Sequence, residues 1–313
     1  MIYAIPKMQQ LSVTNDTKTY TKNVYAPFTT LSGVTDEAYN NYDNSATYNT
    51  GDYVIVPEMK SIYRCSADNV SGVFPLSDES KWTYYGLINS YRMLADDEGI
   101  GAFTTGTNVS FTMDFSRKDT FALISIEFTT LTVTQYDGNT DEIVKTITIQ
   151  GLDIGAFDFA TYFYGTASTV TRVINSEMEW LPNSYITFTF KGDVSIGTLC
   201  IGLSESLGIT LVGTSLDFED KSKIKIDANF GTREVVRFGH IRVLKANILF
   251  DKEEYSLTAQ KISRIIGKTV LFIPTVNDTY LEMSNLAYME KFSLPADGFT
   301  KTATTTTLIG VAT

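Results

Sequence analysis

Histidine and cysteine are scarce in this chain. Its 313 residues include one histidine, His240, and two cysteines, Cys65 and Cys200. A serine–histidine or cysteine–histidine mechanism would have to use that single histidine. A lone histidine in a strand-rich segment is more often structural, and three residues of these types are too few for a typical zinc site. Two cysteines far apart form no disulfide framework, and we expect both to be buried.

Long apolar runs and an excess of basic residues are also missing. No stretch approaches the ~18 apolar residues of a membrane-spanning helix, and the first residues lack the basic segment that opens a secretory signal. The net charge of −11 disfavours nucleic acid as a partner, because phosphate binding needs clustered lysine and arginine. The densest cluster, Lys221, Lys223 and Lys225, is predicted to be a solvated strand face. We expect a protein made in a cytoplasm, without membrane insertion.

Catalytic signatures are equally sparse. A glycosidase needs two carboxylates, but among 36 acidic residues their presence decides nothing. The most clustered are Asp96-Asp97-Glu98 and the pair Glu177 and Glu179, which precedes Trp180. Trp180 can be interpreted as part of a sugar subsite or as a residue of an exposed loop, and the sequence favours the loop. We therefore predict no catalytic residue, no metal site, no cofactor and no enzymatic activity.

Strand-forming residues are abundant, with 18 tyrosines and 19 phenylalanines. Apolar and polar residues alternate with the period of a β-strand over residues 109–115, 121–128 and 131–136, and residues 143–149, 185–190 and 195–203 are predicted to be further strands. Asp137-Gly138 is a turn signal between two of these runs. Short, evenly spaced strands predict a mainly β protein built from antiparallel, jelly-roll-like β-sandwich units.

One helix is expected near the C-terminus of a second β unit. Ser256 is the predicted N-cap, and Gly267 lies where a helix commonly ends. The apolar stripe is predicted to pack on a core and consists of Leu257, Lys261, Ile262, Ile265 and Ile266.

Four regions follow from these patterns. Residues 1–45 are polar, and we expect them to form an irregular arm that docks on a neighbour. We expect a small β-module over residues 46–86 and a β-sandwich over residues 87–208. Residues 209–313 are predicted to form a second β unit that contains the helix.

The small module has the densest local motif. Gly51-Asp52 supplies a turn, residues 53–56 and 62–65 can pair as a hairpin, and Trp82 closes the unit. The pattern resembles small chitin- and cellulose-binding modules, which stack exposed aromatic rings on sugars. That resemblance implies binding through Tyr48, Tyr53, Tyr63 and Trp82. The alternative, which a unit this small favours, is that these rings form the module's own core.

A second resemblance begins where the module ends. Trp82, Gly86, Asn89 and Met93 match a junction found in structural proteins of tailed bacteriophages, although Leu94-Ala-Asp96 departs from the usual Phe-Asp. Segments around Gly213, Asn229, Val235 and residues 262–274, and the closing residues 308–311, resemble the same proteins. The resemblance covers roughly residues 45–313.

This family resemblance implies a component of a virion tail, baseplate, neck or collar. Such proteins usually form symmetric rings or appendages, so the implied partners are other virion proteins and further copies of this chain. A carbohydrate-binding adhesin that recognises a host-surface glycan is the alternative, and a glycan depolymerase is a third hypothesis.

Overall fold

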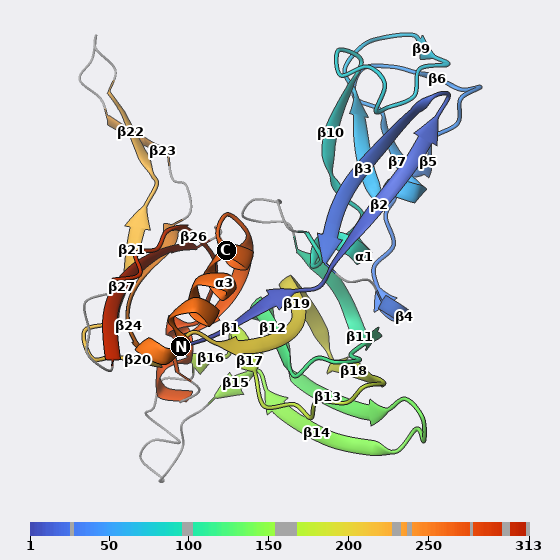
Figure 1. The fold of residues 1–313 in the computed structure, drawn as a ribbon. Helices are drawn as coiled ribbons and strands as arrows, with labels where there is room; N and C mark the ends of the chain where they lie inside the picture. Colours follow the sequence, from blue (N-terminus) through green and yellow to red (C-terminus); the bar gives the residue numbers. More distant parts are fainter. Residues whose placement is uncertain are drawn as a thin grey trace.

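The computed structural model describes residues 1–25, 28–95, 103–153, 168–226, 233–236, 240–275, 278–295 and 301–310. Strands dominate this part of the chain, and the strand pairs are antiparallel except for one short parallel pair. The prediction of a mainly β fold with a short helix near the C-terminus is confirmed. The architecture is β-sandwich-like and contains one large sheet and several small ones (Figure 1).

The N-terminal region is ordered into strands, whereas the sequence predicted an irregular arm. It contains β1 (Ile2–Pro6), β2 (Met8–Asn15), β3 (Lys18–Tyr25) and β4 (Phe28–Val34). Strands β2 and β3 form a hairpin, and β4 pairs with a strand of the sandwich. Apolar residues are few in these two strands, with Leu11 buried and Val13 packed on the core, so the apolar alternation of a half-buried strand is too short to recognise.

The small module follows. Its elements are β5 (Asn40–Asn41), β6 (Thr47–Tyr48), β7 (Tyr53–Val56), the 3-10 turn η1 (Pro57–Met59), β8 (Ser61–Cys65), β9 (Val70–Ser71) and β10 (Trp82–Leu87). Four of these strands form a sheet in the order β10-β8-β7-β5. The predicted hairpin is confirmed, since Tyr53 pairs with Arg64 and Val56 with Ser61. A single helical turn, α1 (Asn89–Arg92), leads out of the module.

The sandwich region carries the six predicted strands and three short ones that the sequence did not predict, at residues 152–153, 168–169 and 172–175. They are β11 (Thr104–Asp114), β12 (Thr120–Glu127), β13 (Thr130–Asp137), β14 (Ile143–Gln150), β15 (Leu152–Asp153), β16 (Ser168–Thr169), β17 (Arg172–Asn175), β18 (Ser184–Lys191) and β19 (Asp193–Ser206). Inward-facing aromatic side chains fill the core, with the rings of Phe111 and Phe188 stacked 4.9 Å apart.

The C-terminal region adds the remaining elements. These are β20 (Ile209–Thr210), β21 (Ser215–Asp220), β22 (Lys223–Ile226), β23 (Arg233–Val236), β24 (His240–Asp251), η2 (Lys252–Glu254), α3 (Tyr255–Ile265), β25 (Thr269–Ile273), η3 (Asp278–Met283), β26 (Asn285–Lys291) and β27 (Lys301–Gly310). Lys221 lies before β22, not on its face as predicted, and forms an ion pair with Glu219 at 2.6 Å.

Helix α3 differs from the prediction at its start and along its stripe. Because η2 runs directly into the helix, Ser256 sits inside the first turn and makes no cap. Ile262 and Ile265 are buried, but Leu257 and Ile266 are exposed, so the packed stripe is narrower than expected. Gly267 does follow the helix, with the positive φ of +73° that a C-terminal glycine supplies.

Strand β1 joins the sandwich to the C-terminal region. It lies between β19 and β25, so that Ile2 pairs with Ser206 on one side and with Ile273 on the other. The large sheet therefore runs without a break in the order β14-β13-β18-β11-β19-β1-β25-β26-β27-β24-β20. The side chain of Arg172 ties the same regions together by donating to the Ser284 carbonyl at 2.8 Å.

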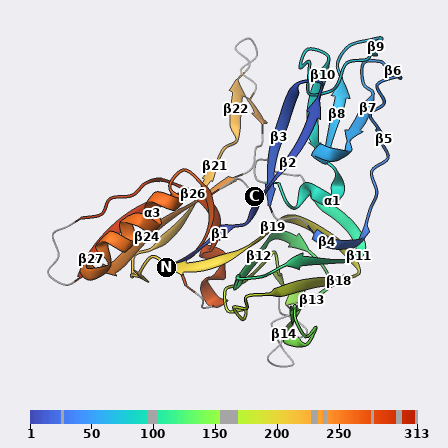
Figure 2. The ribbon, with the colours of Figure 1, turned by 45° about the vertical axis from the view of Figure 1, so that its right-hand side comes forward.

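The small module and the β2–β3 hairpin stand side by side and form a lobe on top of the sandwich (Figure 2). The β22–β23 hairpin projects separately from the C-terminal region, away from the body of the protein (Figures 1 and 2).

Candidate functional site

Trp82 occupies the interior of the small module, and the partly buried Tyr48 packs against it. Trp82 is only 2% exposed, and its indole Nε1 donates to the Val73 carbonyl at 2.9 Å. The Tyr48 ring meets the indole edge-on with centroids 5.2 Å apart, and the Tyr48 hydroxyl accepts from the backbone amide of Asp43. The burial leaves Trp82 without a free ring face for a sugar, which agrees with the alternative that these rings form the module's core.

Tyr53 lies on the other face of the module sheet. It pairs with Arg64 while Val54 pairs with Tyr63, and neighbouring residues of a strand point to opposite faces. Its ring stacks on Tyr39 with centroids 4.9 Å apart and meets Tyr85 edge-on at the same distance. The four predicted residues are thus not brought to one surface.

Tyr63 borders a cleft between the module and the β2–β3 hairpin. The cleft has a volume of about 540 Å³, and its lining residues are Lys18, Tyr20, Tyr63, Pro75, Leu76, Glu79, Trp82, Thr83 and Tyr84. Seven of these nine residues were not predicted to belong to a site: two come from the supposed arm, three from the loop before β10, and Thr83 and Tyr84 from β10 itself. The signal that could have found one wall is the alternation in Lys18-Thr-Tyr20-Thr-Lys22, which places three side chains on one strand face.

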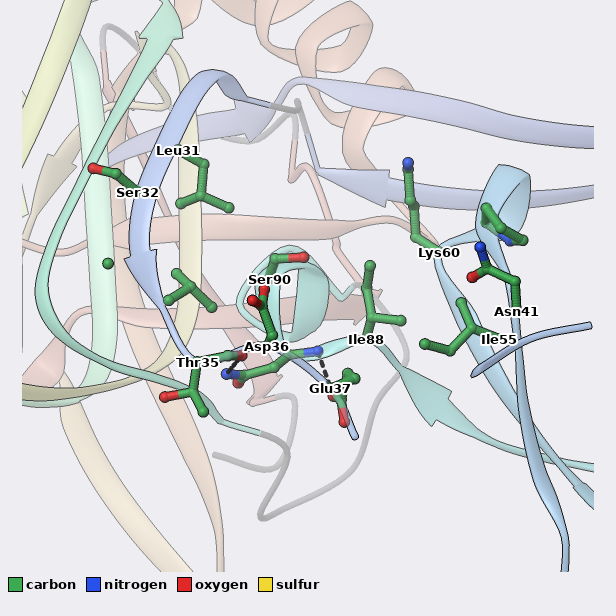
Figure 3. Close-up of a pocket in the computed structure, with 14 residues that line it drawn as sticks. Leu31, Ser32, Thr35, Asp36, Glu37, Asn41, Ile55, Lys60, Ile88 and Ser90 are labelled. Atoms are coloured by element: carbon green, nitrogen blue, oxygen red, sulfur yellow. Dashed lines mark hydrogen bonds between the residues drawn. The ribbon is translucent and has the colours of Figure 1, made fainter. Parts of the chain in front are cut away.

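A second cavity, of about 590 Å³, lies between the module and the sandwich (Figure 3). Thr35, Asp36 and Glu37 face it beside Ile88 and Ser90, and Lys60 and Asn41 come from the module on the other side (Figure 3).

The polar groups at the back of this cavity are committed to structural bonds. The Glu37 carboxylate accepts from the Arg92 guanidinium and from the Asn89 backbone amide, both at 2.7 Å. The buried Asn89 side chain donates to the carbonyls of Thr35 and Thr105 at 2.8 Å and accepts from the Thr105 amide at 2.9 Å. The Glu37 and Asn89 side chains therefore form a hydrogen-bonded joint at this cavity.

The remaining sequence candidates are dispersed. Asp96, Asp97 and Glu98 lie outside the described residues, and for His240 the structure describes only the backbone, at the start of β24. Trp180 is 54% exposed in a loop, which agrees with the loop alternative. Within the described ranges, no group of three or more His, Cys, Asp or Glu side chains could hold a metal ion.

Both cysteines are free and buried, as expected. Burial raises the pKa of the Cys200 thiol to about 12, so it stays protonated near neutral pH. No helix in the described part of the chain is long and apolar enough to span a membrane.

Comparisons of the chain with protein-family models, with curated proteins and with solved structures return no match. The candidate sites are therefore interpreted from their own geometry.

Proposed function

We propose that this chain is a non-enzymatic structural component of a phage virion, in the tail, baseplate or collar. Its partners are other virion proteins and further copies of itself, bound through the strands of the β-sandwich. The observation that carries the assembly role is the open edge of the large sheet at β14. Among the described strands, β14 pairs with β13 alone, through seven residue pairs.

An open strand edge offers a row of unpaired backbone donors and acceptors to another chain. Monomeric proteins usually protect such edges with projecting lysines, prolines or bulges. Strand β14 contains no proline, and its one lysine, Lys145, is bonded to the Glu177 carbonyl. Its β-bulge lies at the start of the strand, at Val144, and residues 145–150 keep a regular register with β13. Ile143 at its start is 64% exposed. These features favour strand addition by a neighbouring subunit.

The β22–β23 hairpin is a second feature that favours a partner. Its two strands pair with each other and with no other strand that the structure describes. An isolated two-stranded hairpin is marginally stable in water. A projecting hairpin of this kind gains stability when a neighbouring subunit packs against it.

Sedimentation velocity of the full chain tests the assembly role. Thr146 is exposed on β14, and Thr146→Lys places a charge on the open strand. The matched control is Thr14→Lys, which changes an exposed threonine on β2. We expect the wild type and Thr14→Lys to form oligomers and Thr146→Lys to stay monomeric. A wild type that remains monomeric at all concentrations, or equal behaviour of both variants, would count against β14 as the contact.

Carbohydrate binding, as in a host-surface adhesin, is the second candidate function. The specific observation in its favour is the cleft beside the module, which Tyr63 and the partly exposed Tyr84 line. One chain could perform both functions, because the strands β8 and β10 beside the cleft and the edge strand β14 belong to different sheets.

A further inference from the structure

We propose that the β22–β23 hairpin of one copy of this chain docks on the open edge of β14 in the next copy. The inference rests on the proposed assembly role and names the partner of both segments as the same chain. Figures 1 and 2 both show the hairpin far from β14 within one molecule, so the contact joins two copies.

The register of the hairpin collects apolar residues on one of its faces. Ile224 pairs with Val235 and Ile226 with Arg233, so these four residues share a face. Three of the four are apolar, and the fourth is basic. In the described part of the chain the hairpin pairs with no other strand. This face therefore has no sheet to extend within its own copy.

Strand β14 has two faces of the same kinds. Ile147 and Ile149 pair with buried residues of β13 and pack on the core of the sandwich. Thr146 lies between them and the start of the strand and is exposed on the opposite face. A hairpin strand added to this edge with its apolar face inward would continue the row of Ile147 and Ile149. Residues 145–150 keep a regular register, long enough for either four-residue strand of the hairpin.

An acidic loop lies on the inward side of the same edge. Lys145, in the row of Ile147, donates to the carbonyl of Glu177 and so holds this loop beside β14. Glu177 and Glu179 are both exposed, and Trp180 next to them is 54% exposed. Docking of the apolar face brings Arg233 to this side of the strand. Arginine pairs with carboxylates and stacks on tryptophan rings, so the loop suits that residue.

The overall charges of the two surfaces are also opposite. Strands β22 and β23 carry Lys223, Lys225 and Arg233 against one acid, Glu234, which gives a net charge of +2 (3 − 1). The whole chain has a net charge of −11. A basic projection on an acidic protein is attracted to the acidic surface of another copy, which favours the encounter.

A contact between two different surfaces is heterologous. Each copy offers one hairpin and one β14 edge, so copies add head to tail and close into a ring or continue as a filament. A symmetric contact of β14 with β14 would instead stop at a dimer.

Sedimentation velocity of full-length charge variants tests the contact. Arg233→Glu reverses the charge of the hairpin face, and Glu177→Lys combined with Glu179→Lys reverses the loop. We expect either change to weaken self-association at least about tenfold, because like charges then meet across the interface. The three substitutions in one chain restore opposite charges and should restore assembly. Lys252→Glu is the matched control, since it reverses an exposed basic residue outside both surfaces.

A mixture of two blocked variants tests the head-to-tail arrangement. Arg233→Glu keeps an intact β14 edge, and Thr146→Lys keeps an intact hairpin. Mixed in equal amounts, the two should form a one-to-one complex that does not grow further. Unchanged circular dichroism of each variant excludes unfolding as the cause of lost assembly.

The proposal is overturned if the wild type self-associates and Arg233→Glu does so equally well. It is also overturned if the mixture contains no complex, or if the three combined substitutions fail to restore assembly. In each of these cases the assembly role of β14 can still hold, because Thr146→Lys alone tests it. A wild type that stays monomeric contradicts the proposed function itself.

Discussion

The side chain of Asn89 and the backbone of Thr105 exchange two hydrogen bonds. Asn89 Nδ2 donates to the Thr105 carbonyl at 2.8 Å, and the Thr105 amide donates to Asn89 Oδ1 at 2.9 Å. The amide group thus imitates a strand partner for β11 at the point where the module meets the sandwich. This gives a physical reason for an asparagine in the junction that follows the module.

Loss of this joint should destabilise the protein. Asn89→Ala leaves the backbone groups of Thr35 and Thr105 without their buried partners, and we expect a loss of about 3 kcal/mol in the free energy of unfolding. Urea unfolding followed by circular dichroism measures it. Asn41→Ala is the control, because Asn41 is exposed and lines the same cavity. Equal stability of the two variants would contradict a structural role for Asn89.

We expect substitution of Trp82 to lower the stability of the fold. Trp82→Phe removes the hydrogen bond to Val73 and should cost about 1 kcal/mol. Trp82→Ala also empties the core of the module and should cost about 3–5 kcal/mol. The exposed Trp180 provides the control, and Trp180→Ala should leave the urea midpoint nearly unchanged. A stable, folded Trp82→Ala protein would contradict this assignment.

Asp114 should stabilise the fold in a pH-dependent way. Partial burial alone would raise its pKa, but hydrogen bonds from Lys7 and Ser116 and the charge of Lys118 hold the pKa well below its usual range. A lowered folded-state pKa contributes stability above the unfolded value of about 3.9, and this stability is lost as the pH falls toward the folded value.

Asp114→Asn should therefore destabilise the protein at pH 7 by at most about 1 kcal/mol, because the carboxylate is half exposed. The difference from wild type should shrink between about pH 4 and pH 2 in urea unfolding. Asp16→Asn, in the exposed turn of the β2–β3 hairpin, should show no such trend. A difference that stays constant with pH would rule out the ionic contribution.

Neither cysteine should react while the protein is folded. Cys200 is buried and its pKa is raised to about 12, and Cys65 is buried with its thiol donating to the Ala67 carbonyl. Iodoacetamide at pH 8 should label neither residue in the native protein and both in urea. Rapid labelling of Cys200 in the native protein, detected by mass spectrometry, would show that this core opens readily.

Local patterns predicted the fold where one face of a strand is buried. Strand β18 alternates visibly because Phe188 and Phe190 face the core and threonines face outward. Gly267 marked the end of α3 because few other residues tolerate its positive φ. Strand β1 escaped prediction, since its placement depends on pairing with Ser206 and its neighbours in β19 on one side and with Ile273 and its neighbours in β25 on the other, both remote in sequence.

The cleft was hidden from the sequence for the same reason. Tyr63 and Trp82 were recognised from the module, but the opposite wall comes from Lys18 and Tyr20, on a strand face whose alternation is carried by lysine and tyrosine and not by apolar residues. Which rings face a cleft and which fill the core depends on how the hairpin packs on the module. Composition and spacing do not specify that packing.

Immunogold labelling of purified phage particles, made from a genome that carries this gene, tests the central claim most directly. Antibody against this chain should label one site on each particle, at the tail, baseplate or collar. Particles that carry no label, while the chain is found free in the lysate, would contradict a structural role in the virion.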